Sequence, residues 1–435
     1  MGIRLATLIT HGATFFALLI PGGHAAAQTM TLTTLYQFKG PPDGANPNSG
    51  LVSGPDGVMY GTTAAGGIID DGEFGGGNGC GIVYSLTPPA VSGQPWTESI
   101  LHAFAGGSDG CSPSSGVVVG AGGVLYGTTS NGASSFSGGA VYSLTPPTTA
   151  GGVWTETVLH TFAGCPTDAV TPSGVAAGPD GVLYGDSFYG GAYSCLPPNG
   201  AGLGAVFSLS PPVSPGGAWS EDVFSVGSGG TLDGPSGGVT AGSGGVLYAA
   251  TVYGGKYCCG ALFTLVPPAS PGGDWTQPII HSFGNPTIKH DGQYPGGNVV
   301  IDSSGVIYGT ASGGGSGGGE VYSLAPPAEP GGDWTYKILY DPASSPSQLT
   351  LGEGGVLYST MPNGGTSSAG TVFSLTPPAS AGGSWNATTL YTFTGGSGAY
   401  PNGGLLIGSG GVLFGTTAGR DATPPNVGTV FMLTP

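Results

Sequence analysis

The segment at residues 285–297 (NPTIKHDGQYPGG) holds the side chains with the clearest chemical potential. His290 or Tyr294 could act as a general base, and the nearby Lys289 could neutralise the carboxylate of a uronate sugar. A polysaccharide lyase needs these roles. Side chains adjacent in sequence rarely converge on one point, so a solvated loop is the alternative. His290 and Tyr294 are therefore candidate catalytic residues and no more.

Positive charge is scarce, because 6 Lys and Arg residues stand against 23 Asp and Glu residues, for a net charge of −17. So acidic a surface repels phosphate backbones and anionic lipid, which argues against nucleic-acid and membrane-surface binding. Four cations fall in segments that vary between repeats. With two neighbouring tyrosines they form the candidate binding residues for an anionic sugar: Lys39, Lys256, Lys289, Arg420, Tyr189 and Tyr257. The alternative is that loops simply tolerate charge better than strands do.

A sevenfold repeat must position these side chains. The motif GVLYGTT and its variants occur at residues 57–63, 123–129, 181–187, 245–251, 305–311, 355–361 and 411–417. Each copy lies between a short apolar run and a run such as VYSLTPP, and a Trp then opens a fourth run such as WTETVLHTF. Four short β-type runs separated by Gly and Pro predict a four-stranded antiparallel meander. Packing such sheets around an axis predicts an all-β, seven-bladed β-propeller; a solenoid is the rival.

The two ends of the chain predict how the ring closes. Residues 31–38 (TLTTLYQF) match the fourth run of a repeat, and residues 430–435 (VFMLTP) match the third. The N-terminal strand should therefore complete the last blade and leave no open edge. The repeats then span roughly 39–104, 105–162, 163–226, 227–283, 284–341, 342–394 and 395–435 plus 29–38.

These motifs together resemble the GloVer-type tandem-repeat (choice-of-anchor) secreted proteins of bacteria. The resemblance covers nearly all of residues 31–435 and implies export and a repeat architecture. It implies no particular reaction. An N-terminal positive charge, a short apolar run and AAA before Gln28 independently predict a signal peptide at residues 1–27, with residues 28–435 forming the propeller. No other segment could cross a membrane, so we expect a secreted or periplasmic protein.

Recurrent polar positions receive structural interpretations. The aspartates of the loops entering the first five blades should accept backbone N–H bonds: Asp43, Asp109, Asp168, Asp233 and Asp291. Calcium-type ligand triplets are missing, so we expect no metal and no cofactor. His102, His160 and His281 share a slot that other repeats fill with Tyr, which predicts packing between blades rather than metal ligation.

Six cysteines in an exported chain indicate disulfides. The propeller frame predicts two pairs, Cys80–Cys111 and Cys165–Cys195. The adjacent Cys258 and Cys259 could form a vicinal disulfide or remain as thiols, and both options stay open. The chain as a whole predicts a monomeric, non-catalytic binding or surface-structural module, with extracellular polysaccharide or a cell-surface component as partner. The alternative is a polysaccharide-active lyase or hydrolase.

Overall fold

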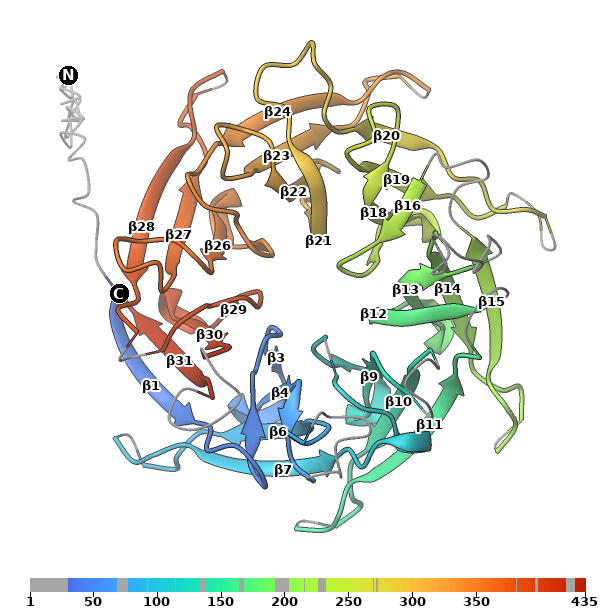
Figure 1. Ribbon diagram of the computed structural model, residues 1–435, viewed down its shortest axis with the longest axis vertical. Helices are drawn as coiled ribbons and strands as arrows, with labels where there is room; N and C mark the ends of the chain where they lie inside the picture. Colours follow the sequence, from blue (N-terminus) through green and yellow to red (C-terminus); the bar gives the residue numbers. More distant parts are fainter. Residues whose placement is uncertain are drawn as a thin grey trace, which may run out of the picture.

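Seven antiparallel sheets stand around a central axis in the computed structural model of the protein (Figure 1). The residues that the structure describes are 30–68, 77–91, 93–113, 115–132, 138–149, 151–163, 168–191, 203–214, 216–225, 232–268, 270, 273–329, 331–380, 382–395, 398–419 and 427–435. Expected features that fall elsewhere, including the signal peptide, lie outside these residues. The predicted all-β, seven-bladed propeller is confirmed.

Each blade is a four-stranded meander whose first strand faces the axis. Blades 1 to 3 are β3(Val52–Ser53), β4(Met59–Thr63), β6(Ile82–Thr87), β7(Thr97–Ala103); β8(Val118–Val119), β9(Leu125–Thr129), β10(Ala140–Thr145), β11(Thr155–Thr161); and β12(Ala169–Ala177), β13(Leu183–Gly190), β14(Ala205–Ser210), β15(Ser220–Ser225). Blades 4 and 5 are β16(Leu232–Pro235) with β17(Thr240–Ala241), β18(Leu247–Gly254), β19(Ala261–Leu265), β20(Ile279–Ser282); and β21(Gln293–Ile301), β22(Ile307–Gly313), β23(Glu320–Ala325), β24(Thr335–Tyr340). Blades 6 and 7 are β25(Thr350–Leu351), β26(Leu357–Met361), β27(Thr371–Thr376), β28(Asn386–Thr392); and β29(Leu406–Ile407), β30(Leu413–Thr417), β31(Thr429–Thr434), β1(Thr31–Gln37).

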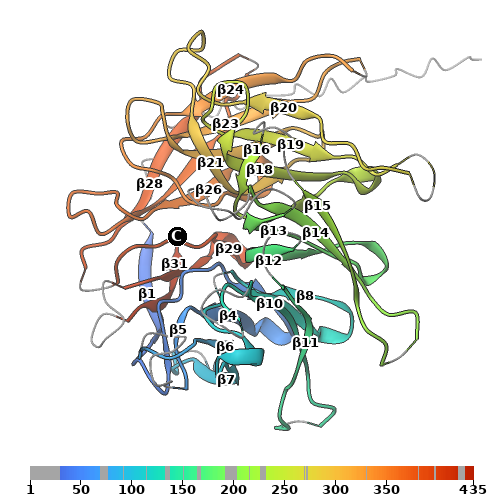
Figure 2. The ribbon, with the colours of Figure 1, turned by 45° about the vertical axis from the view of Figure 1, so that its right-hand side comes forward.

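Blade 7 joins the two ends of the chain, as the sequence predicts. Strand β1 runs antiparallel to β31, with Thr31 opposite Thr434 and Gln37 opposite Thr429. The two strands lie side by side in both views (Figure 1 and Figure 2). This pairing gives blade 7 its fourth strand, so hydrogen bonds between the two ends of the chain close the ring in addition to packing between blades.

Aromatic side chains fill the space between neighbouring blades. The Tyr of a second strand meets the Trp of the next blade edge to face, as Tyr60 does with Trp154 at a ring-centroid distance of 5.8 Å. Deeper in the interface, the Phe after a fourth strand meets the buried aromatic of the next third strand. Phe104 and Tyr142 show this contact at 5.1 Å. These edge-to-face pairs recur around the disc and explain why each repeat carries the same aromatic positions.

Second strands differ in length around the ring. Strands β13 and β18 have 8 residues and β22 has 7, whereas β4, β9, β26 and β30 have 5 each. We call blades 3 to 5 the long arc and blades 6, 7, 1 and 2 the short arc. The first strands β12 and β21 of the long arc also reach 9 residues, so this arc extends further at the same end of its blades.

Candidate functional site

A cavity of about 1090 Å³ lies where the first strands of all seven blades converge. Its lining consists of main chain together with small polar and apolar side chains. Each blade supplies at least one hydroxyl or amide: Ser49, Ser115, Thr171, Ser236, Asn298, Ser347 and Asn402. No Asp, Glu, Lys, Arg or His stands among the described residues that line it. The cavity therefore has a mixed polar and apolar lining without charge, in contrast to the acidic chain that surrounds it.

A proline in the entry segments fixes this lining. Pro47 and Pro295 follow residues with left-handed backbone, Asn46 at φ 56° and Tyr294 at φ 58°. The proline ring packs on the glycine that precedes the third strand of the previous blade. A Cβ on Gly428 would lie 2.4 Å from Cδ of Pro47, so only glycine fits there. The sequence displays this feature as a recurring Pro close to small residues, but the predicted site did not include it.

Exposed aromatic rings stand at the rim of the cavity on the long arc. Phe188 and Tyr189, at the end of β13, line the cavity and contact each other at a centroid distance of 4.7 Å. Tyr294 also lines it and meets Tyr253, at the end of β18, at 5.8 Å. Tyr189, Tyr253 and Tyr294 are 41%, 45% and 38% exposed. We call these four residues the aromatic rim.

The structure directs the two catalytic candidates to different places. Tyr294 belongs to the cavity lining, whereas His290 is absent from it. His290 Nδ1 lies 2.8 Å from Oδ2 of Asp341, in the loop that leads to blade 6. Although burial alone would raise the pKa of Asp341, hydrogen bonds from Ser316 and His290 hold it below its usual value. His290 and Tyr294 therefore do not form a joint catalytic pair in this structure.

Ser316, His290 and Asp341 contain the residue types of a serine-hydrolase triad, but their arrangement differs. Ser316 Oγ lies 2.6 Å from Oδ2 of Asp341 and 3.3 Å from Nδ1 of His290. Serine and aspartate thus contact the same ring nitrogen, and the serine hydroxyl donates to the carboxylate. A triad needs the serine on the opposite nitrogen of the histidine. The cluster links three loops and has no activated nucleophile.

The three predicted cationic residues that the structure describes, Lys39, Lys256 and Lys289, do not line the cavity. Lys256 Nζ sits 5.2 Å from the ring centroid of Tyr257, and Lys39 Nζ sits 5.9 Å from that of Tyr36. Neither lysine, nor Lys289, nor Tyr257 lines the cavity. Arg420 lies outside the described residues. Of the six predicted binding residues, the structure places Tyr189 alone at the cavity, and most of the polar lining was not predicted from the sequence.

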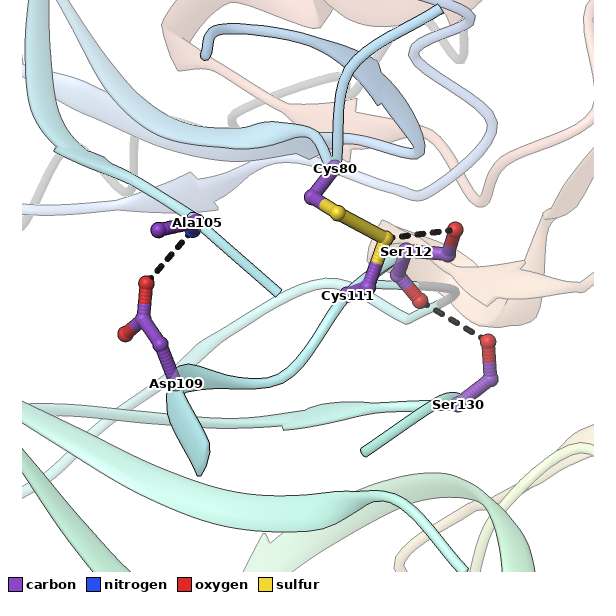
Figure 3. The surroundings of a disulfide bond; sticks show 6 residues. All are labelled: Cys80, Ala105, Asp109, Cys111, Ser112 and Ser130. Carbon is purple, nitrogen blue, oxygen red and sulfur yellow. Dashed lines mark hydrogen bonds between the residues drawn. A yellow bond between two sulfur atoms is a disulfide. The ribbon is translucent and has the colours of Figure 1, made fainter. Parts of the chain in front are cut away.

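Four of the loop aspartates accept backbone N–H groups, as expected, and each also lies near the fourth strand before its loop: Asp43, Asp109, Asp168 and Asp291. Asp43 accepts from Gly44 N at 2.7 Å and from the Tyr36 hydroxyl at 2.9 Å. Asp109 accepts from Ala105 N at 2.6 Å (Figure 3). It also lies 2.9 Å from Nε2 of His102. The shared slot of Tyr and His thus joins these fourth strands to the following loops.

One of the predicted disulfides is present in the structure. Cys80, before β6, is bonded to Cys111, in the loop that enters blade 2 (Figure 3). Cys165 and Cys195 fall outside the described residues. The adjacent Cys258 and Cys259 are not bonded, since both are thiols with their Sγ atoms 3.1 Å apart. The vicinal disulfide that the sequence left open is therefore not formed.

The family model of the Gloeobacter/Verrucomicrobia repeat matches this chain three times, at residues 24–195, 72–271 and 234–435. These matches span nearly all of the chain, so the chain belongs to that repeat family. No curated protein matches it. In the part of the chain that the structure describes, no helix is long and apolar enough to cross a membrane.

Solved structures with a similar fold share little sequence with the chain. A streptogramin B lyase is 14% identical with a TM-score of 0.54, over 94% of this chain and 99% of its own. A fungal alcohol oxidase of the AA5 family with copper is 14% identical with a TM-score of 0.54, over 94% and 77%. PorZ, a surface component of the type-IX secretion system of Porphyromonas gingivalis, is 13% identical with a TM-score of 0.52, over 91% and 47%. At this identity the similarity shows the fold alone, and the fold serves both enzymes and surface proteins.

Proposed function

We propose that the protein is an exported, non-catalytic binding module whose axial cavity takes a neutral oligosaccharide. The observation that carries this proposal is an uncharged cavity of about 1090 Å³ bordered by the aromatic rim. Hydroxyl and amide groups can exchange hydrogen bonds with sugar hydroxyls, and an aromatic ring can cover the apolar face of a sugar. Both kinds of group meet at the cavity mouth on the long arc.

Charge favours a neutral ligand over the anionic one that the sequence suggested. Lys39, Lys256 and Lys289 are absent from the lining, so none of them neutralises a uronate carboxylate there. The net charge of −17 also repels an anionic polymer at a distance. A neutral oligosaccharide avoids both costs.

Binding without cleavage fits the described lining better than hydrolysis does. A glycosidase of the common type needs two carboxyl groups at a fixed separation, and the described lining residues include none. A lyase would have to use a tyrosine hydroxyl without a neighbouring cation. We therefore propose binding, with cleavage as an outcome that the experiment can detect.

Export is part of the same proposal. The Cys80–Cys111 disulfide supports an oxidising compartment, where such bonds persist. The predicted signal peptide at residues 1–27 would take the chain there, and we expect a monomeric protein that is secreted or periplasmic. Extracellular polysaccharide or a cell-surface glycan would then be the partner.

The test compares calorimetric titrations of neutral and uronate-containing oligosaccharides into the purified protein. Tyr189→Ala and Tyr294→Ala should weaken binding of a neutral ligand about tenfold or more, because each removes an aromatic contact at the cavity. Tyr257→Ala removes a tyrosine outside the cavity and should change the affinity less than about twofold, which makes it the matched control.

Two results would overturn the proposal. The first is a neutral ligand whose affinity survives both rim substitutions. The second is a preference for uronate oligosaccharides that disappears in Lys256→Ala or Lys289→Ala. The oligosaccharide is also analysed after incubation with the protein. Shortened products that form with the wild type but not with Tyr294→Ala would establish catalysis instead of binding.

A further inference from the structure

Three side chains meet at the outer part of the interface between blades 2 and 3. His160 lies in β11, Asp168 in the loop that enters blade 3, and Glu221 in β15. Their ligand atoms all lie within 4.8 Å of one another. His160 Nε2 is 3.4 Å from Oε2 of Glu221 and 3.8 Å from Oδ2 of Asp168.

Two polar atoms of this cluster have no hydrogen-bond partner among the described residues. They are Nε2 of His160, which has only the two longer carboxylate contacts, and Oε1 of Glu221, and both are buried from solvent. Oε1 also lacks a partner in Glu98 and Glu156, which occupy the same position in their repeats, so the histidine atom is the distinctive one. Asp168, by contrast, is held in place by a hydrogen bond, because its Oδ1 accepts from the backbone N–H of Ala169 at 2.7 Å. Buried polar groups without partners are costly, so such a group calls for an explanation.

Equivalent positions at the neighbouring interface are closed by a direct hydrogen bond. His102 Nε2 lies 2.9 Å from Asp109 Oδ1, which leaves no room for an ion between them. At the seam of the ring, Tyr36 replaces the histidine and donates to Asp43 at 2.9 Å. Glu156 also interacts with His102 and Asp109, but within the residues that the structure describes, only the blade 2–3 interface brings His, Asp and Glu ligand atoms within 4.8 Å of one another.

The donor set and its spacing match a four-coordinate metal. Zinc binds imidazole nitrogen and carboxylate oxygen at about 2.0–2.2 Å, which puts neighbouring ligands of a tetrahedron about 3.4 Å apart. The two distances from His160 are close to this value. Three protein ligands leave the fourth position to water. Calcium and magnesium prefer six or more oxygen ligands, so they fit this set poorly.

We propose that His160, Asp168 and Glu221 bind one divalent transition-metal ion, with Zn²⁺ as the expected ion, which links blade 2 to blade 3. The ion would satisfy the orphaned atoms of His160 and Glu221 and join β11, the entry loop and β15. Its role is structural and independent of the axial cavity. An ion that binds only the folded chain raises the melting temperature to an extent set by its concentration and affinity.

The test is a calorimetric titration of Zn²⁺ into chelator-treated full-length protein, paired with thermal unfolding. We expect one ion per chain and a higher melting temperature with Zn²⁺, but no comparable effect of Mg²⁺ or Ca²⁺. His160→Ala and Glu221→Gln should each weaken the site at least about tenfold and remove the thermal shift. His102→Ala alters the closed equivalent position and should leave both unchanged.

Cysteines are the main competing zinc ligands, so the titration uses the Cys258→Ser/Cys259→Ser protein. Co²⁺ then serves as an optical probe, because thiolate ligation produces a charge-transfer band that nitrogen and oxygen ligands do not. The proposal is overturned by an absence of stoichiometric zinc binding, by binding that survives His160→Ala and Glu221→Gln, or by a thiolate band. Should one variant fold poorly, the other decides the outcome.

Discussion

The long arc and the short arc share one blade design but end differently at the cavity mouth. In the long arc, β13 and β18 continue through Phe188-Tyr189 and Val252-Tyr253 before they stop at a glycine. In the short arc, β26 stops at Met361, where Pro362 follows. Aromatic and β-branched residues prolong a strand, and proline ends it. A small local difference therefore places exposed aromatic rings on one side of a uniform scaffold.

The two arcs also differ in what stabilises them. The short arc holds the seam between β1 and β31 and the Cys80–Cys111 disulfide. The long arc carries the exposed aromatics and a fully buried acid, Asp186. The terminal seam and the disulfide therefore lie in one arc and the exposed aromatic rings in the other.

The strongest challenge to this comparison is deletion of residues 30–38. Loss of β1 should abolish cooperative unfolding, because it opens blade 7 and removes the buried Leu35 and Phe38. We expect a destabilisation of at least about 5 kcal/mol, comparable to the whole stability of many domains. Calorimetric unfolding measures it, and a peptide of residues 29–38 added in trans should restore the transition. A shortened protein that still binds ligand through the long arc would mean that the arcs are independent.

Removal of the disulfide should have a smaller and more local effect. Cys80 and Cys111 are separated by 31 residues in the sequence, so Cys80→Ala/Cys111→Ala should cost about 3–4 kcal/mol through the greater freedom of the unfolded chain. Urea unfolding measures the change. Ligand affinity should stay the same, because the bond lies in the short arc. The thiols Cys258 and Cys259 provide the control, and their replacement by serine should leave stability unaltered.

The mildest change replaces Asp186 of the long arc by threonine, the residue that blades of the short arc have at this position. Burial raises the pKa of Asp186 to about 7, although a hydrogen bond from Gly238 N opposes the shift. The unfolded chain, with a value of 3.8, therefore loses its proton first as pH rises. The contribution of Asp186 to stability should therefore fall between about pH 4 and 7, by up to about 1.4 kcal/mol for each pH unit, and should stay level above pH 7.

Thr occupies the equivalent position in other blades, as Thr62 does in β4. Asp186→Thr should remove the Asp186 part of this slope and stabilise the protein more at pH 8 than at pH 5. The remaining slope comes from other acids whose pKa values burial also raises, Glu98 and Glu221 to about 7 and Glu320 to about 8. Denaturant unfolding at pH 5 and pH 8 measures both effects. Asp180→Asn changes an exposed acid in the turn before β13 and should keep the slope. A slope that is unchanged in Asp186→Thr would mean that Asp186 does not contribute to it.

The sequence predicted the fold more fully than the site. Seven copies of one motif gave the number of blades, and the match between residues 31–38 and other fourth runs predicted the β1–β31 pairing. Both are local patterns that repetition makes readable. The Cys80–Cys111 bond followed from the same frame.

The cavity depends on contacts that no single repeat contains. Its lining combines residues from Ser49 to Asn402, and each is an ordinary Ser, Thr or Asn in its own repeat. Scarce charged residues such as His290 and Lys256 stand out in the sequence, but the structure places them in contacts outside the cavity. The aromatic rim had a partial signal in Tyr189. The contact between Tyr253 and Tyr294, which belong to two different blades, could not be predicted from the sequence.

Pairing of β1 with β31 also governs when the molecule can complete its fold. Strand β1 is synthesised long before its partner, so blade 7 cannot form until β31 has left the ribosome. Contacts between such distant parts of a chain form slowly. A polypeptide of this kind keeps an unfinished ring during synthesis, which would suit passage through a narrow translocation pore and leave final assembly to the far side.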